Sequence, residues 1–175
     1  MSTLKEPGPA KLVCSIFARH ENVITQALGE LRERFGGIDL ESGLLAFDYT
    51  TYYEPEFGPG LVRKLVSFED LVRQDCLVEV KHMTNDLEQT TASNGKRVVN
   101  IDPGLLTAER LVLATGKNFT HRIYLGRGVF ADLTLIYQGK RFKSLPWTFP
   151  DYASGQVQGF LKGARQIFLE QRDRA

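Results

Sequence analysis

The sequence predicts an α+β domain in which a mixed or antiparallel sheet packs against helices. Strand-like and helical segments follow one another over the first hundred residues in the order β-α-β-β-α-β. This order favours a ferredoxin-like start with both helices on one face of the sheet. Extended segments joined by glycine-containing turns come next and indicate an antiparallel meander. An amphipathic segment then predicts a C-terminal helix.

The first two elements follow from the hydrophobic pattern. Residues 11–18 (KLVCSIFA) are apolar at both parities, which favours a central strand that is buried on both faces. Residues 21–35 carry apolar side chains at helical spacing. Gly36 and Gly37 end this helix, because glycine readily adopts the left-handed conformation of a helix C-cap.

Two further strands and a second helix are expected next. Residues 43–49 and 61–68 are strand candidates, and residues 51–60 between them form a turn-rich loop. Asp75 is a suitable N-cap for a helix that extends to about Thr91.

The second half of the chain alternates between short extended segments and turns. Four segments are expected to be strands: 97–101, 110–115, 121–125 and 129–137. Asp102-Pro103-Gly104 favours a turn, because proline fixes φ and glycine accepts a positive φ. The closing helix, residues 153–172, has one apolar stripe that should pack into the core: Val157, Phe160, Leu161, Ala164, Ile167 and Phe168.

Length and composition indicate one globular domain. The chain has 175 residues, 42% hydrophobic and 25% charged. Residues 1–10 are predicted to be a flexible polar tail, and residues 11–175 a single α+β domain. No apolar run approaches the roughly 20 residues of a membrane span, so no membrane association is expected. Two cysteines at unrelated spacing and the lack of a secretory signal predict a cytoplasmic protein.

The net charge of +1 argues against a bulk polyanion ligand, but the charges are unevenly distributed. Residues 48–88 contain nine acidic and four basic side chains, whereas residues 117–143 contain six basic side chains and one acidic side chain, Asp132. Two interpretations remain open. The two stretches are exposed faces that neutralise each other, within the fold or across a homodimer, or the second is a basic patch for phosphate or nucleic acid.

Familiar catalytic motifs are missing from the sequence. There is no Walker phosphate loop, no dinucleotide-binding glycine pattern, no serine nucleophile elbow and no zinc-ligand spacing. The sequence therefore identifies no cofactor and no metal, and it does not decide whether the protein is an enzyme.

Lys117, His121 and Arg122 are the candidate anion-binding residues. Ammonium and guanidinium groups suit phosphate oxygens, and a histidine can transfer protons. Lys117 and His121 are four residues apart, so on an extended segment both side chains would point to the same face and could face one pocket. Tyr124 and Trp147 complete the predicted ligand-binding set. The alternative is ordinary surface charge on a meander.

Three residues are candidates for a catalytic role: Asp48, Asp102 and His121. Asp48 follows an apolar strand, so its side chain could point into a cleft or bond to the backbone of Thr50. Asp102 could serve as an acid, a base or a metal ligand, or it could simply belong to the predicted turn.

These residues support a first hypothesis of binding, with turnover left open, of a phosphate-bearing small molecule or nucleotide. A second hypothesis is a non-catalytic protein-interaction module that uses the aromatic segment 146–152. A third is a single-stranded nucleic-acid-binding domain, in which the basic meander and its rings would contact phosphates and bases.

Several longer motifs resemble a bacterial family known as domain of unknown function 4416. They are DYTxYYExExGPG (48–60), TNxLE (84–88), VNIDPG (99–104), LVLATxK (111–117), HRIYLG (121–126) and PWTFPDY (146–152). The resemblance implies a soluble bacterial domain, with no established activity and no catalytic residue to carry over. Some members carry a GTP-binding label, but this chain lacks the Walker loop that such a label leads one to expect.

Overall fold

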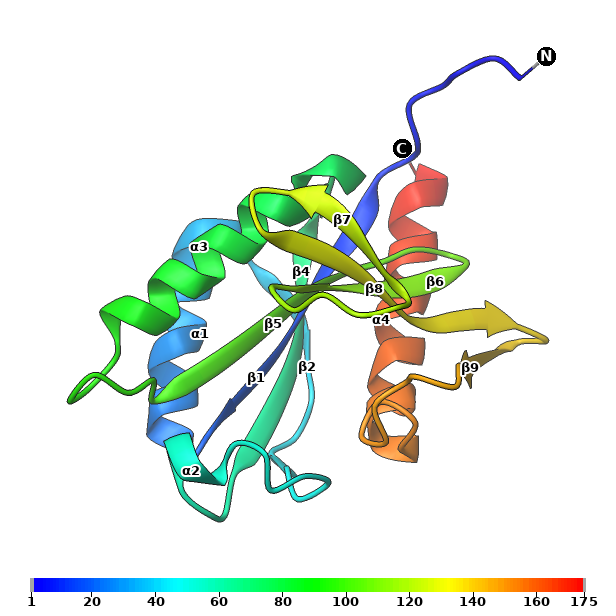
Figure 1. The fold of residues 1–175 in the computed structure, drawn as a ribbon. Coiled ribbons are helices and arrows are strands. Elements are labelled where there is room, and N and C mark those ends of the chain that lie inside the picture. The colour runs from blue at the N-terminus through cyan, green and yellow to red at the C-terminus, as the bar shows by residue number, and fades with distance from the viewer. Residues whose placement is uncertain (1, 175) are drawn as a thin grey trace.

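The fold was analysed in a computed structural model that describes residues 2–174. A nine-stranded antiparallel sheet has the order β2-β4-β1-β5-β6-β8-β7, with β3 paired to β4 and β9 paired to β8 (Figure 1). The strands are β1 (Ala10–Ala18), β2 (Ile38–Glu41), β3 (Leu45–Ala46), β4 (Val62–Val72), β5 (Val99–Leu106), β6 (Arg110–Thr115), β7 (Arg122–Gly126), β8 (Val129–Gln138) and β9 (Arg141–Ser144). The helices are α1 (Glu21–Phe35), α2 (Glu54–Phe57), α3 (Leu77–Thr90) and α4 (Gly155–Arg174), and the 3-10 helix η1 covers Gln74–Cys76.

This architecture confirms the predicted α+β class, with its large antiparallel sheet and C-terminal helix. Strand β1 is buried along its whole length and pairs antiparallel with β4 on one side and β5 on the other. The prediction of a central, buried first strand is therefore confirmed. Cys14 in this strand is 1% exposed.

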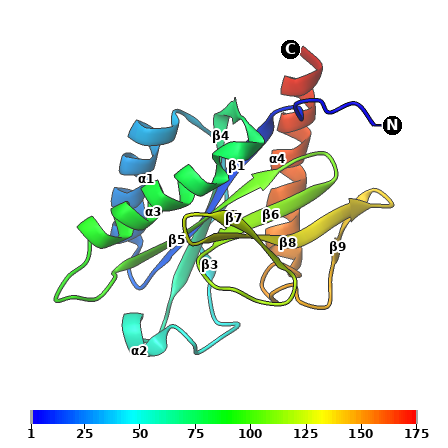
Figure 2. The same cartoon turned by 45° about the horizontal axis from the view of Figure 1, so that its top comes forward.

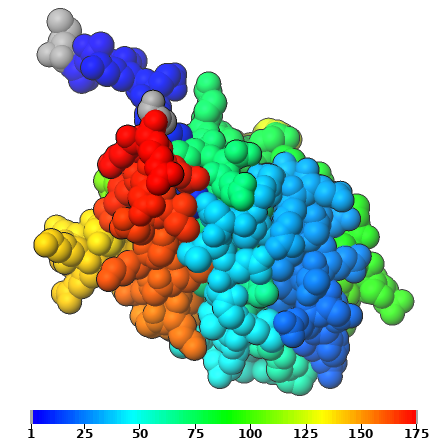
Figure 3. Space-filling model, turned by 180° about the vertical axis from the view of Figure 1, so that it is seen from behind, coloured from blue at the N-terminus to red at the C-terminus, as the bar shows by residue number. Residues whose placement is uncertain are grey.

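Helices cover both faces of the sheet (Figures 1 and 2). On one face, α1 and α3 pack against the side chains of Leu12, Ile16 and Ile101 in one apolar core. On the other face, α4 packs its Phe160 and Leu161 over a second apolar core. In the view from behind, α1 and α4 lie on either side of the segment that runs from β2 into β4 (Figure 3).

Three local predictions are wrong. Residues 43–49 form only the two-residue strand β3, and the longer partner of β4 on the side away from β1 is β2, which starts directly after the glycines. The alternation of Ile38 and Leu40 was the signal for it. Asp75 is not a helix cap, because it pairs with Arg73 and α3 starts after η1. Asp102-Pro103-Gly104 is not a turn and lies within β5.

The position of Pro103 explains why a proline fits inside this strand. Strand β5 pairs with β6 only from Gly104 to Leu106, so its earlier residues lack a strand partner on that side. The N–H and C=O of Ile101 face this open side, and Pro103, two residues later, faces the same way. The missing N–H of proline thus costs no ladder hydrogen bond. Strands β5 and β6 separate here and leave a fork in the sheet.

Residues 2–9 precede the sheet without any helix or strand and are exposed. Figure 3 shows them extending away from the body of the molecule. Met1, which belongs to the predicted tail, and Ala175 lie outside the described residues.

Candidate functional site

A cavity of about 580 Å³ lies on the sheet face that carries α4, where the helix no longer covers the strands. Its floor is formed by alternate residues of the central strands, namely Ser15, Phe17, Arg63, Asn100 and Asp102. Further residues come from the loop before α2 and from the segment before α4. The site therefore combines a rigid sheet floor with loop walls.

An aromatic cluster holds the loop before α2 in place. Phe17 on the floor stacks on Phe47, with ring centroids 4.6 Å apart, and contacts Tyr53 at 4.7 Å and Phe57 at 5.4 Å. Burial raises the pKa of Tyr53 to about 12. Tyr52, its neighbour, is 65% exposed at the edge of the cavity. The cluster thus fixes one wall, and Tyr52 remains accessible.

Arg63 is the most unusual side chain of the cavity, since it is only 2% exposed. It forms an ion pair with Asp151, and its guanidinium carbon lies 4.5 Å from the centroid of Phe47 and 5.4 Å from that of Tyr152. Its Nε and Nη1 atoms have no hydrogen-bond partner within residues 2–174. Buried donors without partners are costly. Arg63 therefore keeps two strong donors without a partner beside the cavity that it lines.

The carboxyl group of Asp151 is also buried beside the cavity. Burial raises its pKa, and the neighbouring guanidinium of Arg63 opposes this effect. The Arg63–Asp151 pair therefore leaves the guanidinium largely neutralised in charge but not saturated in hydrogen bonds.

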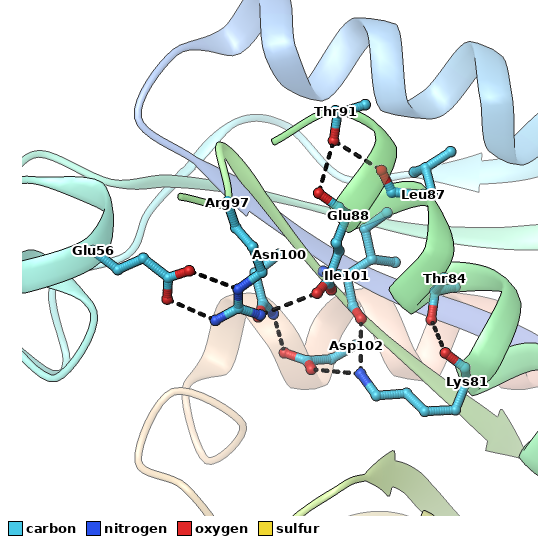
Figure 4. Close-up of polar contacts among 10 residues, drawn as sticks. All are labelled: Glu56, Lys81, Thr84, Leu87, Glu88, Thr91, Arg97, Asn100, Ile101 and Asp102. Atoms are coloured by element: carbon cyan, nitrogen blue, oxygen red, sulfur yellow. Dashed lines mark hydrogen bonds and ion pairs between the residues drawn. The ribbon is translucent and has the colours of Figure 1, made fainter. Parts of the chain in front are cut away.

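Helix α3 packs against β5 and β6 at the fork, on the face of the sheet opposite α4. Its Lys81 and Glu88 side chains point toward Ile101 (Figure 4). Nζ of Lys81 donates to the carbonyl of Ile101 at 3.2 Å, and the N–H of Ile101 donates to Oε1 of Glu88 at 2.6 Å. These two side chains replace the missing strand partner of Ile101. Burial raises the pKa of Glu88, while Lys81 opposes the rise.

A second set of contacts connects the fork to the floor (Figure 4). Arg97 donates to both carboxylate oxygens of Glu56 at 2.8 Å, to Glu88 at 3.0 Å and to Oδ1 of Asn100 at 2.9 Å. Nδ2 of Asn100 in turn donates to Oδ2 of Asp102 at 2.8 Å. The Arg97 hydrogen bonds hold the pKa of Glu56 below its usual value. Asp102 is therefore oriented by a network of charged groups.

The structure brings three of the residues singled out in the sequence to this cavity: Asp102, Lys117 and Arg122. Nζ of Lys117 donates to the hydroxyl of Tyr52 at 2.9 Å, and this contact joins two walls. Nε of Arg122 donates to Asp132 at 2.9 Å and its Nη1 to the carbonyl of Lys117 at 3.0 Å.

The other four residues lie outside the cavity lining. His121 Nε2 lies 3.0 Å from Oδ2 of Asp132, and the histidine ring stacks on Trp147 with centroids 4.8 Å apart. Trp147 donates from Nε1 to the carbonyl of Leu133 at 2.8 Å, and Nδ1 of His121 is buried without a hydrogen-bond partner within residues 2–174. Tyr124 is 60% exposed on β7, and Asp48 is exposed.

Sequence reasoning missed Arg63, Lys81, Arg97 and Asp151. Two of them had a readable signal. Arg63 is a basic residue at the same strand parity as Leu65, and Lys81 lies on the inward face of α3 beside Val80 and Thr84. A charged side chain at a core position needs a partner, which marks a candidate site.

The fold and cavity thus define an α+β domain with a charged pocket on one face of an antiparallel sheet. The family model for domain of unknown function 4416 matches residues 8–168, and the chain belongs to this family. No curated protein and no solved structure matches the chain. Within residues 2–174, no group of three metal-ligating side chains is placed to hold a metal ion, and none of the described helices is long and apolar enough to cross a membrane.

Proposed function

We propose that the cavity binds a small phosphate-bearing molecule. The observation that carries this proposal is Arg63, a buried guanidinium in the cavity floor with two unused donors. Guanidinium groups bind phosphate oxygens through paired, charge-assisted hydrogen bonds. Two more cations support it at the same cavity. Lys117 has no carboxylate within salt-bridge distance among the described residues, and Arg122 is only partly used by Asp132.

The net charge of the lining favours an anion as well. Five basic side chains line the cavity against three carboxylates, a difference of +2: Arg63, Lys81, Arg97, Lys117 and Arg122 against Asp102, Asp132 and Asp151. A cleft lined by one sign of charge concentrates ligands of the opposite sign. A nucleotide is the finer version of this proposal, because Tyr49, Tyr52 and Phe149 line the cavity and offer faces for a flat ring. Turnover would use Asp102 as the acid or base.

Thermal-shift and calorimetric titrations with inorganic phosphate, sugar phosphates and nucleoside monophosphates test this proposal. A ligand present at 100 times its Kd should stabilise the protein by about 2.7 kcal/mol. The Lys117→Ala, Arg122→Ala double variant should lose most of this protection, and Asp48→Ala, outside the lining, should keep it. Equal protection of the wild type and the double variant would exclude these two residues, and no protection by any phosphate would overturn the proposal.

A second candidate function is single-stranded nucleic-acid binding or docking of a protein partner. Phe119 and Tyr124 are 61% and 60% exposed beside the basic segment that contains Arg122 and Arg127. Exposed rings next to cations suit base stacking. Retention on single-stranded RNA that falls steeply with salt would favour nucleic acid, and the absence of such retention would exclude it.

We also propose two properties of the fold. The order β2-β4-β1-β5, antiparallel throughout, supports a ferredoxin-like classification of the first half. The packing of α4 against β1 and β4 supports a single domain over residues 11–175. A bacterial, cytoplasmic setting and a homodimer stay predictions from the sequence.

A further inference from the structure

We infer that the ligand of this cavity carries hydroxyl groups beside its phosphate, and that Asp102 accepts a hydrogen bond from one of them. This inference rests on the proposed function, because it assigns a second contact to the same ligand. It narrows the ligand class to phosphorylated polyols such as sugar phosphates.

The first argument is the open hydrogen-bonding capacity of Asp102. Its Oδ2 accepts from Asn100, whereas its Oδ1 is 3.7 Å from Nζ of Lys81, which is longer than a hydrogen bond. The side chain is 34% exposed and lines the cavity. An ionised carboxylate accepts only and has about four lone-pair sites. Asp102 therefore offers the cavity a strong acceptor that its neighbours do not saturate.

The second argument is that Asp102 is held in position. Its orienting partner Asn100 is itself fixed by Arg97, which is anchored by both oxygens of Glu56. This network links α2, α3 and β5 (Figure 4). An acceptor on a rigid strand with a supporting network fixes the orientation of a bound hydroxyl better than a loop residue does.

The third argument is the spacing between the phosphate receptor and this acceptor. Arg63 pairs with Phe17 of β1, and Asp102 pairs with Ser15 of the same strand. The two positions are thus two strands apart and two residues along, so strand spacing and rise place their Cα atoms about 12 Å apart. Both side chains line one cavity, so one small ligand can contact both. A phosphate and a hydroxyl on one pentose or hexose would meet this requirement.

The charges of Arg63 and Asp102 determine where the phosphate and the hydroxyl of the ligand bind. A phosphate is repelled by the carboxylate of Asp102 and attracted by the donors of Arg63, whereas a hydroxyl is a donor that Asp102 can accept. A site built to receive a hydroxyl discriminates against an analogue without one, because its acceptor loses that partner when the analogue displaces water from the cavity.

Calorimetric titration of the full chain with two matched groups of phosphates tests the inference. Ribose 5-phosphate and glucose 6-phosphate carry hydroxyls, and ethyl phosphate and inorganic phosphate have no hydroxyl-bearing carbon chain. We expect the sugar phosphates to bind the wild type about ten- to a hundredfold more tightly than ethyl phosphate, as expected for one hydrogen bond to a charged group.

Two substitutions at Asp102 and one control locate this preference. Asp102→Asn keeps the shape of the side chain and removes its charge, and Asp102→Ala removes the acceptor. Both should lose most of the preference for sugar phosphates and bind ethyl phosphate as tightly as the wild type or more tightly, because a repelling charge is gone. Asp48→Ala should keep the full preference. Asp102→Asn serves alone if Asp102→Ala fails to fold.

The outcomes separate this inference from the proposal on which it rests. Binding of ethyl and inorganic phosphate without any advantage for sugar phosphates would overturn the inference and leave the proposed function standing. The same holds if the advantage persists in both Asp102 variants. If no phosphate binds the wild type, both fail.

Discussion

The two halves of one sheet face differ sharply although they belong to the same strands. The half under α4 is filled by Val13, Leu65 and Leu106 and is closed by Phe160 and Leu161. The other half lacks the helix and forms the charged cavity. The side chains of both halves lie at alternate positions of the same strands and point to the same face of the sheet. What separates them is a change of residue type within one or two steps along each strand.

Individual strands show where this change occurs. In β1, Val13 is followed on the same face by Ser15, and in β4, Leu65 is preceded by Arg63. In β5, Leu106 is preceded on this face by Asp102, next to the fork. A helix covers the apolar end, since apolar surface is stabilised by removal from water. The polar end would lose hydrogen bonds under such a helix, so it is left open.

The largest expected effect comes from breaking the closed half. Cutting the chain after Tyr152 removes α4 and exposes the core beneath it, so we expect an aggregating or molten protein without a cooperative melting transition. Phe160→Ala should cost about 3–5 kcal/mol of unfolding free energy, measured by urea denaturation. Gln156→Ala, on the exposed side of the same helix, is the matched control. A clean, unshifted transition of the truncated chain would contradict the core assignment.

The second largest expected effect on stability concerns the buried Arg63–Asp151 ion pair in the half of the sheet face that forms the cavity. Arg63→Ala leaves the carboxylate of Asp151 buried without its partner, and breaking a buried pair in this way typically costs about 3–5 kcal/mol. The double variant Arg63→Met, Asp151→Asn removes both charges and should be destabilised less than the single one. Urea denaturation of the three proteins measures this order. A double variant less stable than Arg63→Ala would show that the pair itself is not the cause.

The sequence predicted the closed half better than the open half, for a physical reason. The apolar stripe of α4 and the buried run of β1 are periodic, and periodicity alone specifies their burial. The fork between β5 and β6 depends on the packing of α3 against the opposite face of the sheet. No local sequence pattern predicts that packing. Asp102-Pro103-Gly104 has the composition of a turn, yet Glu88 and Lys81 supply the partners that let this segment stay extended.

The candidate site could likewise be predicted only in part from the sequence. The basic stretch pointed to Lys117 and Arg122, which line the cavity, because clustered charge is visible along the chain. Arg63 comes from a distant strand and shares the cavity only through the strand order β4-β1-β5. His121 was grouped with Lys117 by parity, but the strand begins only at Arg122, so the assumed alternation does not hold between them.

A smaller effect should appear at acid pH in the network of the open half. Hydrogen bonds from Arg97 lower the pKa of Glu56 in the folded state, so its contribution to stability is present above the unfolded value near 4.5 and is lost as the pH falls through the folded value. Glu56 is about one third exposed, and solvent screening limits this contribution to about 1 kcal/mol or less.

The variant Glu56→Gln isolates this contribution from other titrating groups. The difference in unfolding free energy between the wild type and Glu56→Gln should be largest near neutral pH and should shrink as the pH drops below about 4.5. Glu54→Gln in the same short helix is the control, since Glu54 has no side-chain ion pair among the described residues. A difference that stays constant with pH would rule out the Arg97 contact as the cause.

The smallest expected effect is a shift in the titration of Tyr52 at the cavity mouth. Its hydroxyl accepts a hydrogen bond from Nζ of Lys117, and this contact lowers the pKa of Tyr52 below its usual value near 10. Burial raises the pKa values of Tyr53 and Tyr152, so Tyr52 should ionise well before them. Near-ultraviolet absorbance follows tyrosinate formation as the pH is raised.

The earliest titration step should disappear in Tyr52→Phe and return to its usual range in Lys117→Ala, whereas Lys117→Arg should retain most of the shift because a cation remains in reach of the hydroxyl. If Lys117→Ala leaves the first step unchanged, the two walls of the cavity do not meet at this contact in solution, and the open half is wider at its mouth than the structure has it.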